Sequence, residues 1–95
     1  MNDAPGFITR EQIEQQQAER LPSVARQAQV HLSAERMLKE VFLQDAIELS
    51  SADVLESGRS FEELSDQERA DIFRRNYEHV VDRMGRYYRL YEDRN

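Results

Sequence analysis

The last third of the chain carries apolar residues at an alternating spacing of three and four positions. Seven residues follow this heptad pattern: Ala70, Phe73, Tyr77, Val80, Met84, Tyr87 and Tyr91. Such a spacing keeps one stripe of an α-helix turned toward a single neighbour along its whole length. The pattern predicts a long helix over residues 66–92 that packs lengthwise against another helix.

A second apolar stripe at helical spacing covers the middle of the chain, and its members are Val30, Ala34, Met37, Leu38, Val41, Phe42, Ala46 and Leu49. It predicts a helix over residues 23–49, with Ser23 as its capping residue. Leu43 and Ile47 widen the stripe, so we expect residues 41–49 to be almost surrounded by protein.

The N-terminal region predicts a shorter and weaker helix. Residues 1–8 have the character of a flexible tail, and Thr9 with Gln12 forms a capping box for a helix over residues 10–20. Pro22 interrupts this helix. Few of its residues are apolar, so burial stabilises it little, and we expect that it can dock on a partner instead of on the core.

Residues 50–64 are expected to form a connection with short helical turns. Ser50 and Ser51 predict a break, and Gly58 suits the left-handed position that follows a helix. Two further capping boxes mark helix starts, and they pair Ser60 with Glu63 and Ser65 with Glu68.

These elements predict an all-α fold in one small domain that spans residues 1–95. We expect an antiparallel hairpin of two long helices, in which residues 70–91 lie along residues 28–49, plus the short N-terminal helix. The same pattern is compatible with two closures. The seam can close within one chain, or two chains can dimerise into a bundle.

Composition narrows the function only by exclusion. The chain has 95 residues, no cysteine and a net charge of -6, which disfavours general nucleic-acid binding. The start of the chain resembles no secretory signal, and its longest apolar run is Val41-Phe42-Leu43, far too short for a membrane span. We therefore expect a soluble cytoplasmic protein that does not act at a membrane.

No motif for catalysis, for a cofactor or for a metal is present, so we expect a protein that is not an enzyme and has no cofactor. The sequence lacks a glycine-rich phosphate loop and a nucleophile elbow. His31 and Glu35 share a helix face, but no further ligands occur at a recognisable spacing, so no metal site is predicted.

Two surfaces are candidates for partner binding. One is the apolar part of the N-terminal region, with Ile8, Ile13 and Leu21. The other is a face of the last helix that carries arginine and tyrosine, and its candidate members are Arg75, Arg83, Arg86, Tyr88 and Arg89. Both residue types are enriched at protein–protein hot spots. Among these arginines, Arg83 alone lacks an acidic residue three or four positions away.

The preferred hypothesis is a non-enzymatic protein–protein interaction module, a small acidic adaptor, inhibitor or assembly factor that acts on a larger protein. A bacterial or phage accessory protein would have this character, and a homodimer is possible. The alternative is a nucleic-acid-associated protein that uses the face of arginine and tyrosine, because arginine interleaved with aromatic rings can bind phosphates and stack on bases.

Overall fold

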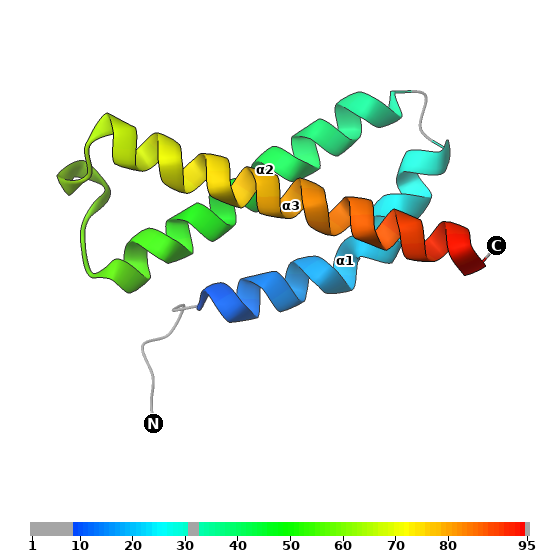
Figure 1. Cartoon of the computed structure of the whole chain (residues 1–95), viewed down its shortest axis with the longest axis horizontal. Helices are drawn as coiled ribbons and strands as arrows, with labels where there is room; N and C mark the ends of the chain where they lie inside the picture. Colours follow the sequence, from blue (N-terminus) through cyan, green and yellow to red (C-terminus); the bar gives the residue numbers. More distant parts are fainter. Residues whose placement is uncertain (1–8, 31–32, 95) are drawn as a thin grey trace.

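The structure, a computed structural model, describes residues 9–30 and 33–94, with side chains as far as Tyr87. Within these residues it is all-helical, as the sequence predicts. The elements are α1 (Arg10–Val30), α2 (Ala34–Ser57), a short 3-10 helix η1 (Phe61–Glu63) and α3 (Asp66–Arg94) (Figure 1). None of the helices described has both the length and the apolar character that crossing a membrane requires.

α1 does not end before Pro22, so the predicted boundary between a helix over 10–20 and a second helix from Ser23 is wrong. α1 continues through Pro22 to Val30. A proline removes one backbone donor from a helix interior, but its fixed φ is itself helical, and the usual result is a bend. The second half of α1 indeed runs at an angle to the first half (Figure 1).

Packing on both sides of the proline explains why α1 persists. Gln17 in the first half is buried, and so are Ala25 and Ala28 in the second half. Tertiary contacts of this kind routinely override a local propensity. α1 is thus part of the packed structure and not a separate arm.

The boundaries of α2 also differ from the prediction. The helix begins at Ala34, after Ser33 at the N-cap position, and it continues through Ser50 and Ser51. The predicted break at these two serines is therefore wrong. The hydroxyl of Ser50 accepts a hydrogen bond from Asn76 Nδ2 at 3.1 Å, so this residue serves the contact with α3 and not a helix end.

The end signals at Gly58 and at Ser65 with Glu68 are confirmed. Gly58 ends α2 with φ 77°, and its N–H donates to the carbonyl of Leu55 at 3.2 Å. At the start of α3, Ser65 N donates to Glu68 Oε1 at 2.9 Å and Glu68 N donates to Ser65 Oγ at 3.1 Å. The predicted range of this helix, residues 66–92, agrees closely with the observed one.

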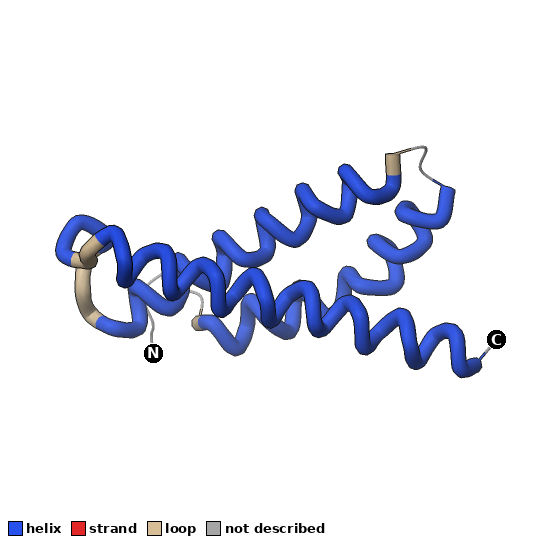
Figure 2. The backbone as a smooth tube through the Cα atoms, turned by 45° about the horizontal axis from the view of Figure 1, so that its top comes forward, coloured by secondary structure: helices blue, strands red, loops and turns tan. Residues whose placement is uncertain are grey.

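The three helices are arranged so that α2 packs against both α1 and α3 and runs opposite to each of them (Figures 1 and 2). α2 and α3 cross and do not lie side by side along their full length. Their register also differs from the expected one, because Asn76 of α3 lies against Ser50 and Asp53 of α2. The expectation that residues 70–91 lie along residues 28–49 is therefore wrong, since α2 extends further than predicted.

This crossing divides the heptad seam of α3 into two parts. Val80 and Met84 are buried, as is Ala46 of α2. Toward the start of α3, Ala70 is exposed, and Phe73 and Tyr77 are only half-buried. One half of the seam therefore closes the core, and the other half faces an open part of the surface.

Candidate functional site

A layer of hydrogen-bonded polar side chains joins the three helices near the start of α1. Arg10 Nη1 donates to Asn76 Oδ1 at 2.6 Å and to Asp53 Oδ2 at 2.9 Å. Asn76 Nδ2 donates in turn to Asp53 Oδ2 at 3.0 Å. Because Asn76 is buried, its amide needs such partners to offset the loss of water.

A second layer lies further along the bundle and is more deeply buried. Gln17 Nε2 donates to the carbonyl of Asp45 at 3.1 Å, and Gln17 Oε1 accepts from Arg83 Nη2 at 2.9 Å. Arg83 Nη2 also lies 3.4 Å from Asp45 Oδ2. The side chain of Arg83 is only 13% exposed, so it faces the interior of the bundle.

The electrostatics of this layer are those of a desolvated ion pair. Burial raises the pKa of Asp45, and the positive charges of Arg20 and Arg83 oppose that rise. Burial likewise lowers the pKa of Arg83, against the attraction of Asp45. Arg83 Nε and Nη1 are buried without a hydrogen-bond partner. The pair therefore holds the helices in place at an electrostatic cost.

The predicted arginine and tyrosine residues of α3 are not brought together as one surface. Arg83 turns inward, whereas Arg75 is exposed and Arg86 lies on the surface, where its Nη2 is 2.9 Å from Asp82 Oδ2. The side chains of Tyr88 and Arg89 lie outside the described part. A role in partner binding for these residues stays a prediction.

The apolar candidates of α1 are turned toward the bundle. Ile13 and Leu21 are half-buried. Leu21 lines a cavity of about 380 Å³ between α1 and α2, together with Val24 and Met37. Ile8 lies outside the described residues.

The histidines show no metal-binding arrangement within the described part. His79 Nε2 lies 2.6 Å from Glu14 Oε1 and so links α3 to α1. His31 lies outside the described residues. Among the side chains that the structure describes, in residues 9–30 and 33–87, no three from His, Asp or Glu come close enough together to hold a metal ion.

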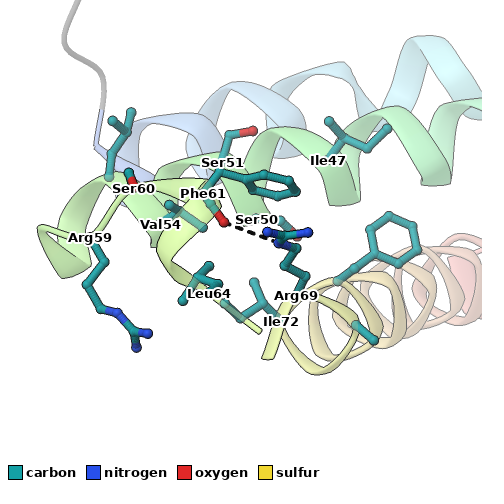
Figure 3. A pocket seen from close by; sticks show the side chains of 13 residues that line it. Ile47, Ser50, Ser51, Val54, Arg59, Ser60, Phe61, Leu64, Arg69 and Ile72 are labelled. Carbon is teal, nitrogen blue, oxygen red and sulfur yellow. Dashed lines mark hydrogen bonds between the residues drawn. The ribbon is translucent and has the colours of Figure 1, made fainter. Parts of the chain in front are cut away.

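An apolar groove of about 710 Å³ lies where α2, η1 and α3 meet (Figure 3). We call it the α2–α3 groove. Eight of its thirteen lining residues are aliphatic or aromatic, three are serines, two are arginines, and none is acidic. The lining residues are Ile47, Ser50, Ser51, Val54, Leu55, Arg59, Ser60, Phe61, Leu64, Arg69, Ala70, Ile72 and Phe73.

Large apolar side chains of this region are exposed to an unusual extent. Leu55 is 61% exposed, Phe61 57% and Ile47 49%. Leu43, one turn before Ile47, is exposed too. The expectation that residues 41–49 are almost surrounded by protein is therefore wrong for this chain alone. Contiguous apolar exposure of this kind typically marks an interaction site.

The loop that carries Phe61 is held at both ends. On one side Gly58 ends α2, and on the other side Ser60 N donates to Glu63 Oε1 at 2.8 Å within the predicted capping box. Arg59 Nη2 donates to the carbonyl of Glu63 at 3.2 Å. An exposed aromatic ring on a loop so fixed loses little conformational entropy when it is covered.

Arg69 is the charged group that lies inside the groove. Its guanidinium stacks over the ring of Phe61 at 4.5 Å, and its Nε donates to the carbonyl of Phe61 at 3.2 Å. The other lining arginine, Arg59, points away from the ring (Figure 3), and its Nη1 pairs with Glu68 Oε2 at 3.1 Å. The interior of the groove thus combines apolar walls with one positive charge.

The sequence analysis did not predict this groove, although two features of the sequence pointed to exposed apolar residues. The surplus of apolar residues on α2, with Leu43 and Ile47 beyond the main stripe, exceeded what one neighbouring helix could cover. Phe61 lies inside the Ser60–Glu63 capping box, outside the long helices α2 and α3. What could not be foreseen was the crossing of α2 and α3, which leaves these residues on one open face.

The sequence matches no family model, and no curated protein or solved structure matches it either.

Proposed function

We propose that this chain is a non-enzymatic protein–protein interaction module, a small acidic adaptor, inhibitor or assembly factor that binds a larger protein through the α2–α3 groove. The observation that carries the proposal is the exposure of Ile47, Leu55 and Phe61 around one groove. Aromatic and aliphatic anchors of this kind dominate the binding energy of protein interfaces.

The way these anchors are held also supports the proposal. Leu55 and Ile47 belong to a long helix, and Phe61 belongs to a loop fixed by hydrogen bonds. Exposing them to water is unfavourable by roughly 25 cal/mol for each Å² of apolar surface. A partner that covers them gains this free energy without having to order the site first.

The test compares capture of partner proteins from a lysate of the source cells by three tagged proteins: the wild type, Leu55→Asp and Val30→Asp. Val30 is 84% exposed and lies at the end of α1, outside the lining of the groove, so Val30→Asp is the matched control. Circular dichroism first establishes that both variants remain helical.

We expect a protein that the wild type and Val30→Asp both retain and that Leu55→Asp loses. Partners retained equally by all three proteins would refute a role for the groove. Repeating the capture after nuclease treatment tests the nucleic-acid alternative, because a partner bridged by DNA or RNA would then disappear.

A further inference from the structure

We propose that the occupant of the α2–α3 groove is an amphipathic helix of a partner protein whose apolar stripe is flanked by a carboxylate, and that this carboxylate binds Arg69. The inference rests on the proposed function and adds the chemistry of the partner. Three features support it: the positive charge of the groove, the N–H groups of Arg69 that no other group in the described part of the chain uses, and the repulsion that two copies of the groove would face in a symmetric dimer.

The charge of the groove is opposite to that of the chain. The whole protein has a net charge of -6, yet the lining of the groove contains two arginines and no acidic residue. Arg59 points outward (Figure 3) and pairs with Glu68. The charge that a bound ligand meets inside the groove is therefore that of Arg69.

The donors of Arg69 are only partly used. Its Nε donates to the carbonyl of Phe61, and its Nη1 lies 3.2 Å from Asp66 Oδ1. A guanidinium has five N–H groups, so three are left by these two contacts for a ligand. The Asp66 side chain is fully exposed, and a surface pair of this kind is weak. Nη2 and the second N–H of Nη1 can thus donate hydrogen bonds to a carboxylate.

The shape of the groove suits a helix. Its walls come from α2 on one side and from α3 on the other, with Ile47 and Val54 facing Leu64 and Ile72 and with Arg69 between them (Figure 3). Amphipathic helices commonly bind such hydrophobic grooves between helices through side chains at positions i, i+3, i+4 and i+7.

A second copy of the chain fits the groove less well. A two-fold contact pairs a patch with itself, so a dimer through this groove would place Arg69 near Arg69 of the other copy, with no acidic lining residue to separate them. The two chains would also each carry a charge of -6. A partner helix that carries a carboxylate beside its apolar stripe places no second arginine against Arg69, and it need not carry a net charge of -6.

The test is a selection of displayed 16-residue helical peptides on the full chain. Leucine is fixed at positions i, i+3 and i+7, all other positions are randomised, and peptides that also bind Leu55→Asp are removed. We expect the enriched peptides to carry Asp or Glu at one position beside the leucines. A synthetic peptide of that sequence should bind Arg69→Glu roughly 10- to 100-fold more weakly than the wild type.

Because Arg69 also contacts Phe61, a loss of affinity alone would not show a direct contact. The peptide in which the selected Asp or Glu is replaced by Lys supplies the second measurement. We expect this Lys peptide to bind Arg69→Glu more tightly than it binds the wild-type protein. A loop that is merely displaced by the substitution would not reverse the preference in this way.

Each of the other possible results of the selection refutes a specific part of the proposal. Enriched peptides with neutral or basic flanks, or a charge swap without rescue, would refute the carboxylate while leaving the groove as the docking site. No enrichment over Leu55→Asp would refute helix docking, whereas binding at the groove itself is refuted only when Leu55→Asp captures the same partners as the wild type. A wild-type dimer that Leu55→Asp dissociates in analytical ultracentrifugation would identify a second copy as the occupant.

Discussion

Replacement of Arg83 by methionine tests whether the buried pair, and not the many surface pairs, holds α3 in place. Asp45 is 7% exposed, and in Arg83→Met its nearest remaining cation is Arg20, 3.9 Å away and itself 53% exposed. Protonating a carboxyl with an ordinary pKa of 3.8 costs about 4 kcal/mol at pH 7, and this value limits the penalty for stranding Asp45.

Part of that penalty is recovered. The substitution removes Arg83 Nε and Nη1, two buried donors without partners, each of which costs about 1–3 kcal/mol. It also leaves Gln17 Oε1 without the donor Arg83 Nη2, which costs about 1–3 kcal/mol again. With the middle of each range, the losses exceed the recovered free energy by about 2 kcal/mol. We therefore expect a net loss of about 2 kcal/mol, which shifts the midpoint of urea unfolding, followed by circular dichroism, by about 1 M.

Arg86→Met is the matched control on the same helix. Arg86 lies closer to its acidic partner, 2.9 Å from Asp82 Oδ2, than Arg83 lies to Asp45. Both members of this surface pair are more than half exposed, so we expect its loss to change stability by no more than about 0.5 kcal/mol. Burial, and not distance, decides the difference between the two arginines.

Two results would refute this reasoning. The effect of Arg83→Met should be smaller at pH 4.5, where Asp45 is protonated at little cost, and an effect independent of pH would exclude a stranded carboxylate. The double variant Asp45→Asn/Arg83→Met should be more stable at pH 7 than Arg83→Met alone. Additive losses in the double variant would show that the two side chains are not coupled.

Three further predictions concern the same bundle. Gly58→Ala should destabilise the protein by about 1 kcal/mol because φ is 77° there. Gly85→Ala, on an exposed part of α3 with no atom near an added Cβ, should stabilise it by about 1 kcal/mol. Changes of the same sign for both variants in thermal unfolding would contradict this prediction. Gln17→Leu should lose about 1–3 kcal/mol in urea unfolding by leaving buried donors and acceptors unpaired, while the exposed neighbour Gln16→Leu should be near neutral; equal effects would be the contrary result. Burial raises the pKa of Asp45 above 3.8, so its contribution to stability is greatest below pH 3.8 and declines as the pH rises through the raised native pKa. Asp45→Asn should therefore flatten the curve of unfolding free energy against pH above about pH 4. Parallel curves for the two proteins would exclude the raised pKa.

The sequence predicted best what is decided locally. The start of α3 at Asp66 and the end of α2 at Gly58 depend on residues within one turn of each position. The serine caps with Glu63 and Glu68 can be recognised from the three-residue spacing alone. These features hold whatever the tertiary arrangement.

Features that depend on distant contacts were predicted poorly. Pro22 and Ser50 carry signals for a helix end, but packing of α1 on α2 and the hydrogen bond from Asn76 keep both helices continuous. Arg83 had a readable signal, since it lacks an acidic residue one turn away in sequence. That absence was compatible with a free surface charge, and the partner, Asp45, lies on another helix.

The polar contacts between α1 and α3 fix the register of the two helices. Arg10 meets Asn76, Glu14 meets His79 and Gln17 meets Arg83, so each contact joins residues 65 or 66 positions apart. Two of the buried residues of α1 are alanines, Ala25 and Ala28, which specify a register only weakly, whereas a slip of one turn would break all three polar contacts together. A single-residue deletion inside either matched stretch would displace the contacts on one side of it relative to those on the other, so length is more tightly constrained there than side-chain size.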